Sequence, residues 1–170
     1  MVNQKDMETL FLKAFEDYSD AIFRHCYFRV YSKERAEELM QETFMKAWDY
    51  ARKGGEIREI RPFLYKIANN LVIDESRKKK TFSLDLLKEQ GFDPRGSGEH
   101  EVLATVASKE LIEILDTLET KHKEVLVMRF INDLQPKEIA RTLGVSENVI
   151  SVRIHRALRH LKEITGDLSL

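Results

Sequence analysis

The feature that most constrains this sequence is the stretch from residue 135 to residue 161, QPKEIARTLGVSENVISVRIHRALRHL. Pro136 suits a first helical position, where its missing N–H group is not needed. Gly144 follows an apolar helical pattern at the place where helices often end in a left-handed residue. Ser146 then suits the N-cap of a second helix. The stretch therefore predicts two short helices joined by a tight turn.

The predicted second helix has two contrasting faces. Ile150, Ile154, Ala157 and Leu161 recur on one face, and Ala140 offers a small residue where the two helices cross. The other face carries polar and cationic residues: Asn148, Ser151, Val152, His155, Arg156 and Arg159. This pattern is typical of a helix-turn-helix, whose second helix enters a DNA major groove. The alternative is an antiparallel helix pair with a solvated basic face.

Composition limits how such a chain binds nucleic acid. The formal net charge of the 170 residues is −1, so any contact with DNA must come from local patches. The single cysteine, Cys26, excludes an internal disulfide and fits a reducing compartment. Because Cys26 shares a helical face with Ile22 and Val30, we expect a buried structural thiol.

Neither a signal peptide nor an apolar run of the ~20 residues that span a bilayer is found, so we expect a soluble, cytoplasmic protein. The sequence also lacks runs of alternating β-branched residues, and we therefore predict an all-α fold. No cofactor or metal site is expected. His155 and His160 lie five residues apart, which is an off-face spacing for a helical metal pair, and no HExxH motif occurs.

The apolar pattern divides the chain into two helical domains joined by a linker. Helices are predicted over about residues 7–30, 33–52 and 62–80, and they form a three-helix domain assigned to residues 1–80. Residues 81–101 lack sustained periodicity, contain Gly91, Pro94, Gly96 and Gly98, and are predicted to be a flexible acidic linker. A four-helix domain that includes the helix-turn-helix is assigned to residues 102–170.

A second basic site lies at the predicted third helix. Arg58 and Arg61 precede this helix, Asn69 and Asn70 lie on it, and Lys78–Lys80 close it. Asparagine can hydrogen-bond base edges, and the rings of Phe63 and Tyr65 could stack on unpaired bases. A solvated basic helix end explains the same residues equally well.

Three segments, taken in order, resemble the bacterial extracytoplasmic-function sigma factors. Residues 36–44, AEELMQETF, resemble the family's Ala-Glu-Asp-Leu-x-Gln-Glu-x-Phe signature. Residues 63–74, FLYKIANNLVID, resemble its Trp-Leu-x-x-Ile-Ala-x-Asn-x-x-x-Asp segment, and the helix-turn-helix with His155-Arg156-Ala157 resembles its closing motif. The resemblance implies a non-enzymatic factor that binds core RNA polymerase, recognises a promoter and melts its −10 element. It also makes an anti-sigma partner an expectation.

The resemblance implies three sets of site residues. The set expected to bind RNA polymerase is Glu38, Gln41, Glu42 and Phe44. The set expected to bind the −10 element is Arg61, Asn69, Asn70, Asp74, Arg77, Lys78, Lys79 and Lys80. The set expected to bind the −35 element is Arg141, Asn148, Ser151, Val152, His155, Arg156 and Arg159.

The sequence departs from the family pattern at a few positions, and it leaves rival interpretations. Val149-Ile150-Ser151 stands where relatives often carry Thr-Val-Lys, and the missing lysine predicts weaker or altered −35 binding. Glu38 replaces aspartate, and Phe63 replaces tryptophan. The rivals are a dimeric helix-turn-helix regulator that binds DNA without polymerase, a histidine-dependent metalloenzyme and a protein-binding adaptor.

Overall fold

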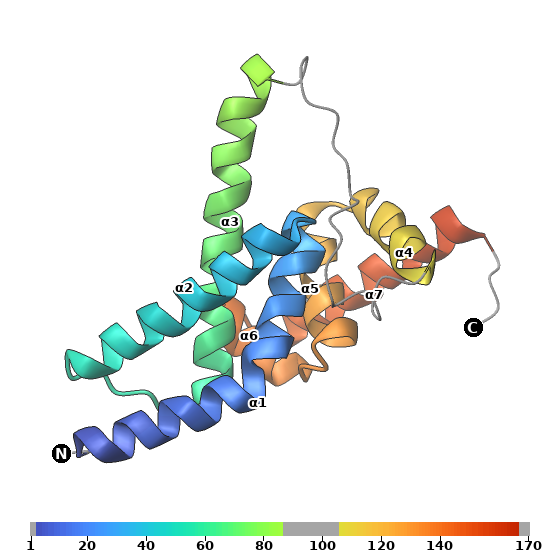
Figure 1. The fold of residues 1–170 in the computed structure, drawn as a ribbon. Helices are drawn as coiled ribbons and strands as arrows, with labels where there is room; N and C mark the ends of the chain where they lie inside the picture. The colour runs from blue at the N-terminus through green and yellow to red at the C-terminus, as the bar shows by residue number, and fades with distance from the viewer. Residues whose placement is uncertain (1–2, 87–105, 167–170) are drawn as a thin grey trace. The chain divides into compact units, whose positions relative to one another are not determined.

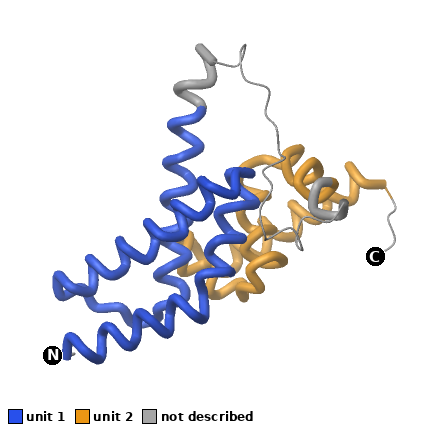
Figure 2. Tube along the Cα trace, in the orientation of Figure 1, with its two compact units in different colours: residues 1–94 blue, residues 95–170 orange. Residues whose placement is uncertain are grey.

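The computed structural model describes residues 3–86 and 106–166, with side chains for residues 3–79 and 110–166. All regular elements in these ranges are helices, which confirms the predicted fold class (Figure 1). The chain divides into two compact units, residues 1–94 and residues 95–170 (Figure 2). Each unit has its own hydrophobic core.

Unit 1 is built from three helices that pack against one another: α1 (Gln4–Val30), α2 (Lys33–Arg52) and α3 (Ile60–Leu86). Its centre holds Ile22, Leu39, Leu64 and Val72, which are fully buried. The N-terminal half of α1 meets α2 through two aromatic pairs, with ring centroids 5.2 Å apart for Phe11–Trp48 and 4.9 Å apart for Phe15–Phe44. These contacts hold α2 against α1.

The predicted helices match the observed ones closely at α2 and less closely at α3. Helix α2 has the predicted bounds, and Ser32 caps it by accepting a hydrogen bond from the Arg35 N–H at 3.3 Å. Helix α3 continues past Lys80 to Leu86, although residues 81–86 were assigned to the linker. Residues 81–86 contain neither glycine nor proline, so nothing in them breaks a helix. The remaining linker residues, 87–101, lie outside the described residues.

Unit 2 contains α4 (Val106–Asp116), α5 (Thr120–Leu126), a π-helical turn labelled η2 (Val127–Ile131), α6 (Pro136–Leu143) and α7 (Glu147–Thr165). Its core includes Val125, Met128, Leu134, Ile139 and Ile150, which are all fully buried. Helix α7 packs against α4, α5 and α6. Helix α5 begins at Thr120, and Glu119 is its N-cap residue.

Three large apolar residues of these helices are exposed. Phe15 keeps its ring contact with Phe44 but is 44% exposed, and Leu111 is 38% exposed. Phe130 is 59% exposed. It lies in the η2 turn, where the Asn132 N–H donates to the Val127 carbonyl at 3.0 Å. Because a π-helix winds more widely than an α-helix, the three- and four-residue spacing used to predict the buried face fails there.

Candidate functional site

The helix-turn-helix predicted from residues 135–161 is present in unit 2 as α6, a tight turn and α7. Pro136 opens α6, and the Glu138 carboxylate accepts a hydrogen bond from the Gln135 N–H at 2.9 Å. Gly144 ends α6 with a left-handed φ of 66°, a conformation that a side chain disfavours. Ser146 caps α7 by accepting a hydrogen bond from the Val149 N–H at 3.3 Å. These local interactions fix where α7 begins.

One face of α7 is buried and the opposite face is available to a ligand. Ile150 and Ala157 are fully buried, and Ile154 and Leu161 are half-buried. All residues predicted to face DNA on this helix are exposed: Asn148, Ser151, Val152, His155, Arg156 and Arg159. Arg141, on α6, is exposed as well. The face therefore combines cationic, hydrogen-bonding and apolar groups, which are the groups that read base edges in a major groove.

A second polar row follows α3 in unit 1. Lys66, Asn70 and Asp74 are exposed and lie four residues apart, so they project from one side of the helix. Arg77, Lys78 and Lys79 continue the exposed surface toward the end of the helix. The side chain of Lys80 lies outside the described residues. This row offers an amide, a carboxylate and several cations to a ligand.

Two of the residues expected at this site are buried. Asn69 is only 3% exposed, and its side-chain oxygen accepts a hydrogen bond from Arg29 Nη1 at 3.1 Å. Asn69 therefore connects α3 to Arg29 on α1, and its role at the −10 element stays a prediction. Tyr65 was expected to offer aromatic surface, but it is fully buried, and its ring centroid lies 5.5 Å from that of His25.

The loop that leads into α3 is ordered by an aromatic pair. The rings of Tyr50 and Phe63 lie 5.0 Å apart, and Gly55 passes directly beneath Tyr50. A Cβ atom on Gly55 would lie 2.2 Å from Tyr50 Cε1, so only glycine fits without moving the ring. Arg58 is exposed in this loop, and Arg61 is half-buried. Tyr50 is 45% exposed and adds the aromatic surface that Tyr65 does not provide.

The outer face of α2 carries the residues expected to bind polymerase. Glu38 and Gln41 are exposed, and Glu42 is half-buried with its carboxylate 3.5 Å from Lys46 Nζ. Phe44 is different, because it is only 8% exposed and its ring packs on Phe15. Phe44 therefore packs between α1 and α2, and its contact with polymerase stays a prediction.

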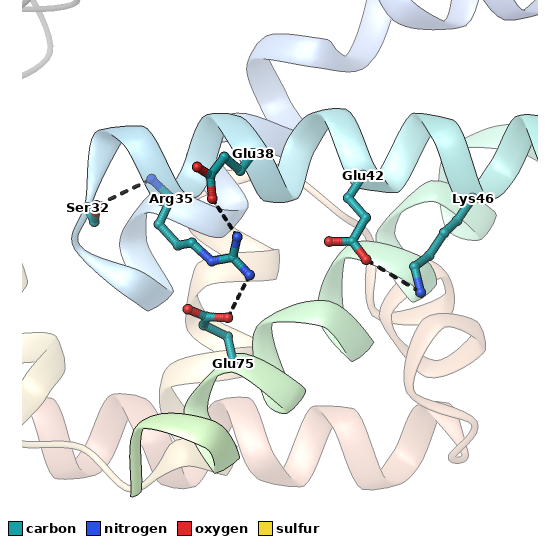
Figure 3. Close-up of polar contacts among 6 residues, drawn as sticks. All are labelled: Ser32, Arg35, Glu38, Glu42, Lys46 and Glu75. Carbon is teal, nitrogen blue, oxygen red and sulfur yellow. Dashed lines mark hydrogen bonds and ion pairs between the residues drawn. The ribbon is translucent and has the colours of Figure 1, made fainter. Parts of the chain in front are cut away.

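Arg35 connects this face of α2 to α3 (Figure 3). Its guanidinium donates to the Glu38 carboxylate within α2, and Arg35 Nη2 donates to Glu75 Oε2 on α3 at 2.8 Å. The hydrogen bonds to Glu75 and Glu38 raise the pKa of Arg35 above its ordinary value. The hydrogen bond from Arg35 lowers the pKa of Glu75, and the charges of Arg35, Lys79 and Lys78 act in the same direction. Arg35 and Glu75 are therefore both charged at neutral pH.

An apolar groove of about 430 Å³ lies beside the polar face of α2, between α1 and α2. The lining residues are Glu8, Phe11, Leu12, Phe15, Phe44, Met45 and Trp48. Leu12 and Met45 are 69% and 67% exposed, and the sequence analysis did not identify either of them. The signal that could have found them is apolar character at positions off the buried stripe of an amphipathic helix.

Cys26 is fully buried, as predicted, and burial raises its pKa to about 12. Within residues 3–86 and 106–166, no helix combines the length and the apolar character needed to cross a membrane. The same ranges bring together no group of three or more histidine, cysteine, aspartate or glutamate side chains able to hold a metal ion.

Solved structures confirm the fold by similarity. The sigma factor RpoE in complex with the anti-sigma factor NepR from Bartonella quintana aligns with a TM-score of 0.73 at 19% identity, over 92% of this chain and 98% of that one. CnrH in complex with the cytosolic domain of CnrY aligns with a TM-score of 0.69 at 22% identity, over 98% of this chain and 92% of that one.

Curated relatives are similar in sequence to this protein along nearly the whole chain. The ECF RNA polymerase sigma factor BldN of Streptomyces coelicolor is 30% identical over 164 residues, which cover 92% of this chain but 61% of BldN. SigL of Mycobacterium tuberculosis is 26% identical over 92% of this chain and 89% of SigL. SigW of Bacillus subtilis is 26% identical over 97% of this chain and 94% of SigW.

Two family models match the two units separately. Sigma-70 region 2 matches residues 14–82, which include α2 and most of α3. Sigma-70 region 4 matches residues 108–161, which include the helix-turn-helix. Because the two matches occur in this order and together span most of the chain, and because its relatives are ECF factors, the chain belongs to the sigma-70 family as an extracytoplasmic-function RNA polymerase sigma factor.

Proposed function

We propose that this chain binds core RNA polymerase and directs it to promoters, with unit 2 reading the −35 element and unit 1 melting the −10 element. The observation that carries the proposal is the order of the two family regions along one chain, each with an exposed polar helix face. None of these roles requires a bond-making residue. Both partners lie in the bacterial cytoplasm, so the proposal places the chain there.

For the −35 element, we propose that α7 enters the major groove with its exposed face. Arg156 is an exposed cation whose planar guanidinium can donate two hydrogen bonds to one guanine. Arg141 and Arg159 are placed to contact phosphates, which set the register of the helix on the duplex. Ser151 stands where relatives often carry lysine, so this chain has one cation fewer at the groove.

The −35 role predicts a specific effect of Arg156→Ala. A lost base contact weakens duplex binding by about 1–3 kcal/mol and relaxes preference at one base pair. A gel shift with polymerase holoenzyme on −35 duplexes of varied sequence measures both effects. Lys121→Ala, which removes an exposed lysine from α5, is the control and should leave −35 binding unchanged. Unchanged binding by Arg156→Ala would remove Arg156 from the interface.

For the −10 element, we propose that the exposed row of α3 holds the displaced non-template strand. In this proposal the exposed side chains of Asn70 and Asp74 hydrogen-bond a base taken out of the stack, and the exposed cations Arg77, Lys78 and Lys79 contact phosphates. Extruding a base costs a few kcal/mol, which stacking and phosphate contacts on this surface offset. Asn69 has no base contact in this proposal, because its side chain is committed to Arg29.

For polymerase, we propose that the exposed groups of α2 form the docking surface, with Glu38, Gln41 and Glu42 as its polar contacts. The carboxylates predict a cationic partner surface and binding that weakens as salt rises. The related RpoE and CnrH structures are complexes with NepR and CnrY. We therefore propose that an anti-sigma factor also binds this chain and competes with polymerase.

Run-off transcription with core RNA polymerase tests the proposed function most directly. Transcripts should begin at defined promoters only when the chain is added, and they should be lost when either promoter element is scrambled. Footprinting of the chain without polymerase supplies the contrast with an independent helix-turn-helix regulator. Absence of a chain-dependent transcript, together with absence of binding to core polymerase, would overturn the proposal.

A further inference from the structure

Arg35 lies between two carboxylates that come from different helices and differ in environment. Glu75, on α3, has a side chain that is 13% exposed, whereas the side chain of Glu38, on α2, is 63% exposed. The Arg35 side chain itself is 32% exposed. One planar guanidinium thus holds a nearly buried acid with one nitrogen and a solvent-facing acid with another.

The two bonds differ in what an incoming partner can reach. The Glu75 bond joins α2 to α3 and is partly shielded from water, which strengthens it relative to a fully exposed pair. The Glu38 bond lies at the surface, where water and a cationic partner group can replace Arg35. Glu75 therefore anchors Arg35 on α3, and the bond from Arg35 to Glu38 is easier to replace than the bond to Glu75.

These two acids belong to surfaces with different proposed partners. Glu38 lies on the α2 face assigned to polymerase, and Glu75 follows Asp74 directly on the helix assigned to the −10 strand. Arg77, Lys78 and Lys79 begin two residues later. Arg35 is thus the side chain that contacts both acids, one on each surface.

We propose that Arg35 is a positioning residue that couples the polymerase-facing carboxylate of Glu38 to the promoter-facing helix α3 through Glu75. This inference rests on the proposed function. While Glu75 holds Arg35, the Glu38 carboxylate is free to exchange Arg35 for a cation of polymerase. Without Glu75, Glu38 is the only carboxylate that Arg35 pairs with. Arg35 then competes more strongly with a polymerase cation for the Glu38 carboxylate.

The other ion pair on this face provides a contrast. Glu42 pairs with Lys46, four residues later on α2, and both side chains are at least 42% exposed. Figure 3 shows this pair further along α2, separate from the Arg35 cluster. Glu42 therefore lacks the link to Glu75 that Arg35 gives Glu38, and it should not respond to a change at Glu75.

A double-mutant cycle on the full chain tests the coupling. The affinity for core RNA polymerase is measured for wild type, Glu38→Gln, Glu75→Gln and the double variant. Glu75→Gln should weaken binding about two- to fivefold in the wild-type background, as expected for a partly exposed ion pair. In the Glu38→Gln background it should leave binding unchanged. When the cycle is repeated on a chain that carries Arg35→Met, Glu75→Gln should have the same effect on binding with and without Glu38→Gln.

The control cycle combines Glu42→Gln with Glu75→Gln, and its effects should be additive. Circular dichroism at the binding temperature establishes that each variant is folded. Should Glu75→Gln unfold, Glu75→Asp withdraws the carboxylate by one methylene while keeping its charge, and it should give the same pattern with smaller amplitude.

The outcomes separate this inference from the proposed function. If Glu75→Gln weakens polymerase binding by the same factor in the wild-type and Glu38→Gln backgrounds, Glu75 has only a structural role. The coupling is then overturned. If the effect is absent in both backgrounds, the coupling is likewise overturned, while wild-type binding keeps the proposed function intact. Failure of the wild-type chain to bind core polymerase would overturn the proposed function and this inference together.

Discussion

Asn69 and Asn70 are neighbours in the sequence but have opposite environments. Successive residues of an α-helix point about 100° apart, so one asparagine faces α1 while the other faces solvent. Asn69 is 3% exposed and accepts a hydrogen bond from Arg29, which is itself only 9% exposed. A nearly buried guanidinium requires such an acceptor. The same residue type therefore stabilises the fold at position 69 and is available for recognition at position 70.

We predict that Asn69→Leu destabilises unit 1 by about 1–3 kcal/mol, because Arg29 loses a buried hydrogen-bond acceptor. Chemical denaturation monitored by circular dichroism measures the change. Asn70→Ala removes the exposed neighbour and should change stability by at most about 0.5 kcal/mol. Equal effects of the two variants would contradict the structural role assigned to Asn69.

The thiol of Cys26 should make stability depend on alkaline pH. Burial raises its folded-state pKa from 9.0 to about 12, so above pH 9 the unfolded chain releases this proton and the folded chain keeps it. The free energy of unfolding should therefore fall between pH 9 and 12, by up to about 1.4 kcal/mol per pH unit from this group. The difference in the free energy of unfolding between wild type and Cys26→Ala, measured from pH 9 to 12, isolates the contribution of this thiol. A constant difference would contradict the prediction.

At the scale of the element, helix ends are fixed by a few local hydrogen bonds. Helix α7 begins after Ser146, whose hydroxyl accepts the Val149 N–H, and the preceding turn depends on the left-handed Gly144. The recognition face of α7 has a defined position because its start is fixed in this way. Ser32 acts similarly for α2, so the helices proposed to bind polymerase and the −35 element each have a serine cap.

We predict that Ser146→Ala destabilises unit 2 by about 1 kcal/mol, since an orphan N–H at the start of α7 loses its acceptor. Thermal denaturation followed by circular dichroism checks this value. The matched control is Ser151→Ala, in the middle of the same helix, whose exposed hydroxyl only donates to the Glu147 carbonyl. That variant should stay within about 0.5 kcal/mol of wild type. A Ser146→Ala variant as stable as the control would rule out the cap as a stabilising contact.

At the scale of the whole molecule, the chain carries two separate hydrophobic cores. Ile22, Leu64 and Val72 are buried among α1–α3, whereas Leu134 and Ile150 are buried among the helices of unit 2. A separate core for each promoter-binding unit allows each to keep its shape independently of the other.

Two cores predict two unfolding transitions. Leu64→Ala should destabilise only the transition of unit 1, and Ile150→Ala only that of unit 2, by about 2–5 kcal/mol each. Hydrogen exchange measured by mass spectrometry assigns each loss of protection to residues 3–86 or 106–166. One cooperative transition that responds equally to both substitutions would contradict independent cores.

The sequence by itself determined the features that depend on local interactions. The all-α class, the bounds of α2, the Ser146 cap, the Gly144 turn and the burial of Cys26 were all predicted. Each follows from the spacing of apolar residues or from a hydrogen bond within one turn of helix. The exposed face of α7 was also predicted. Once the first residue of a helix is known, helical periodicity determines which of its residues share a face.

Only the tertiary structure decided which helical side chains meet a neighbouring helix. Spacing could not show that Asn69 meets Arg29, 40 positions away in the chain, or that Arg35 reaches Glu75 at the same separation. It also missed the π-helical turn that exposes Phe130, because a change of winding leaves no distinct residue pattern. The reason is physical: the sequence repeats at the period of a single helix, whereas these contacts depend on how the helices lie against one another.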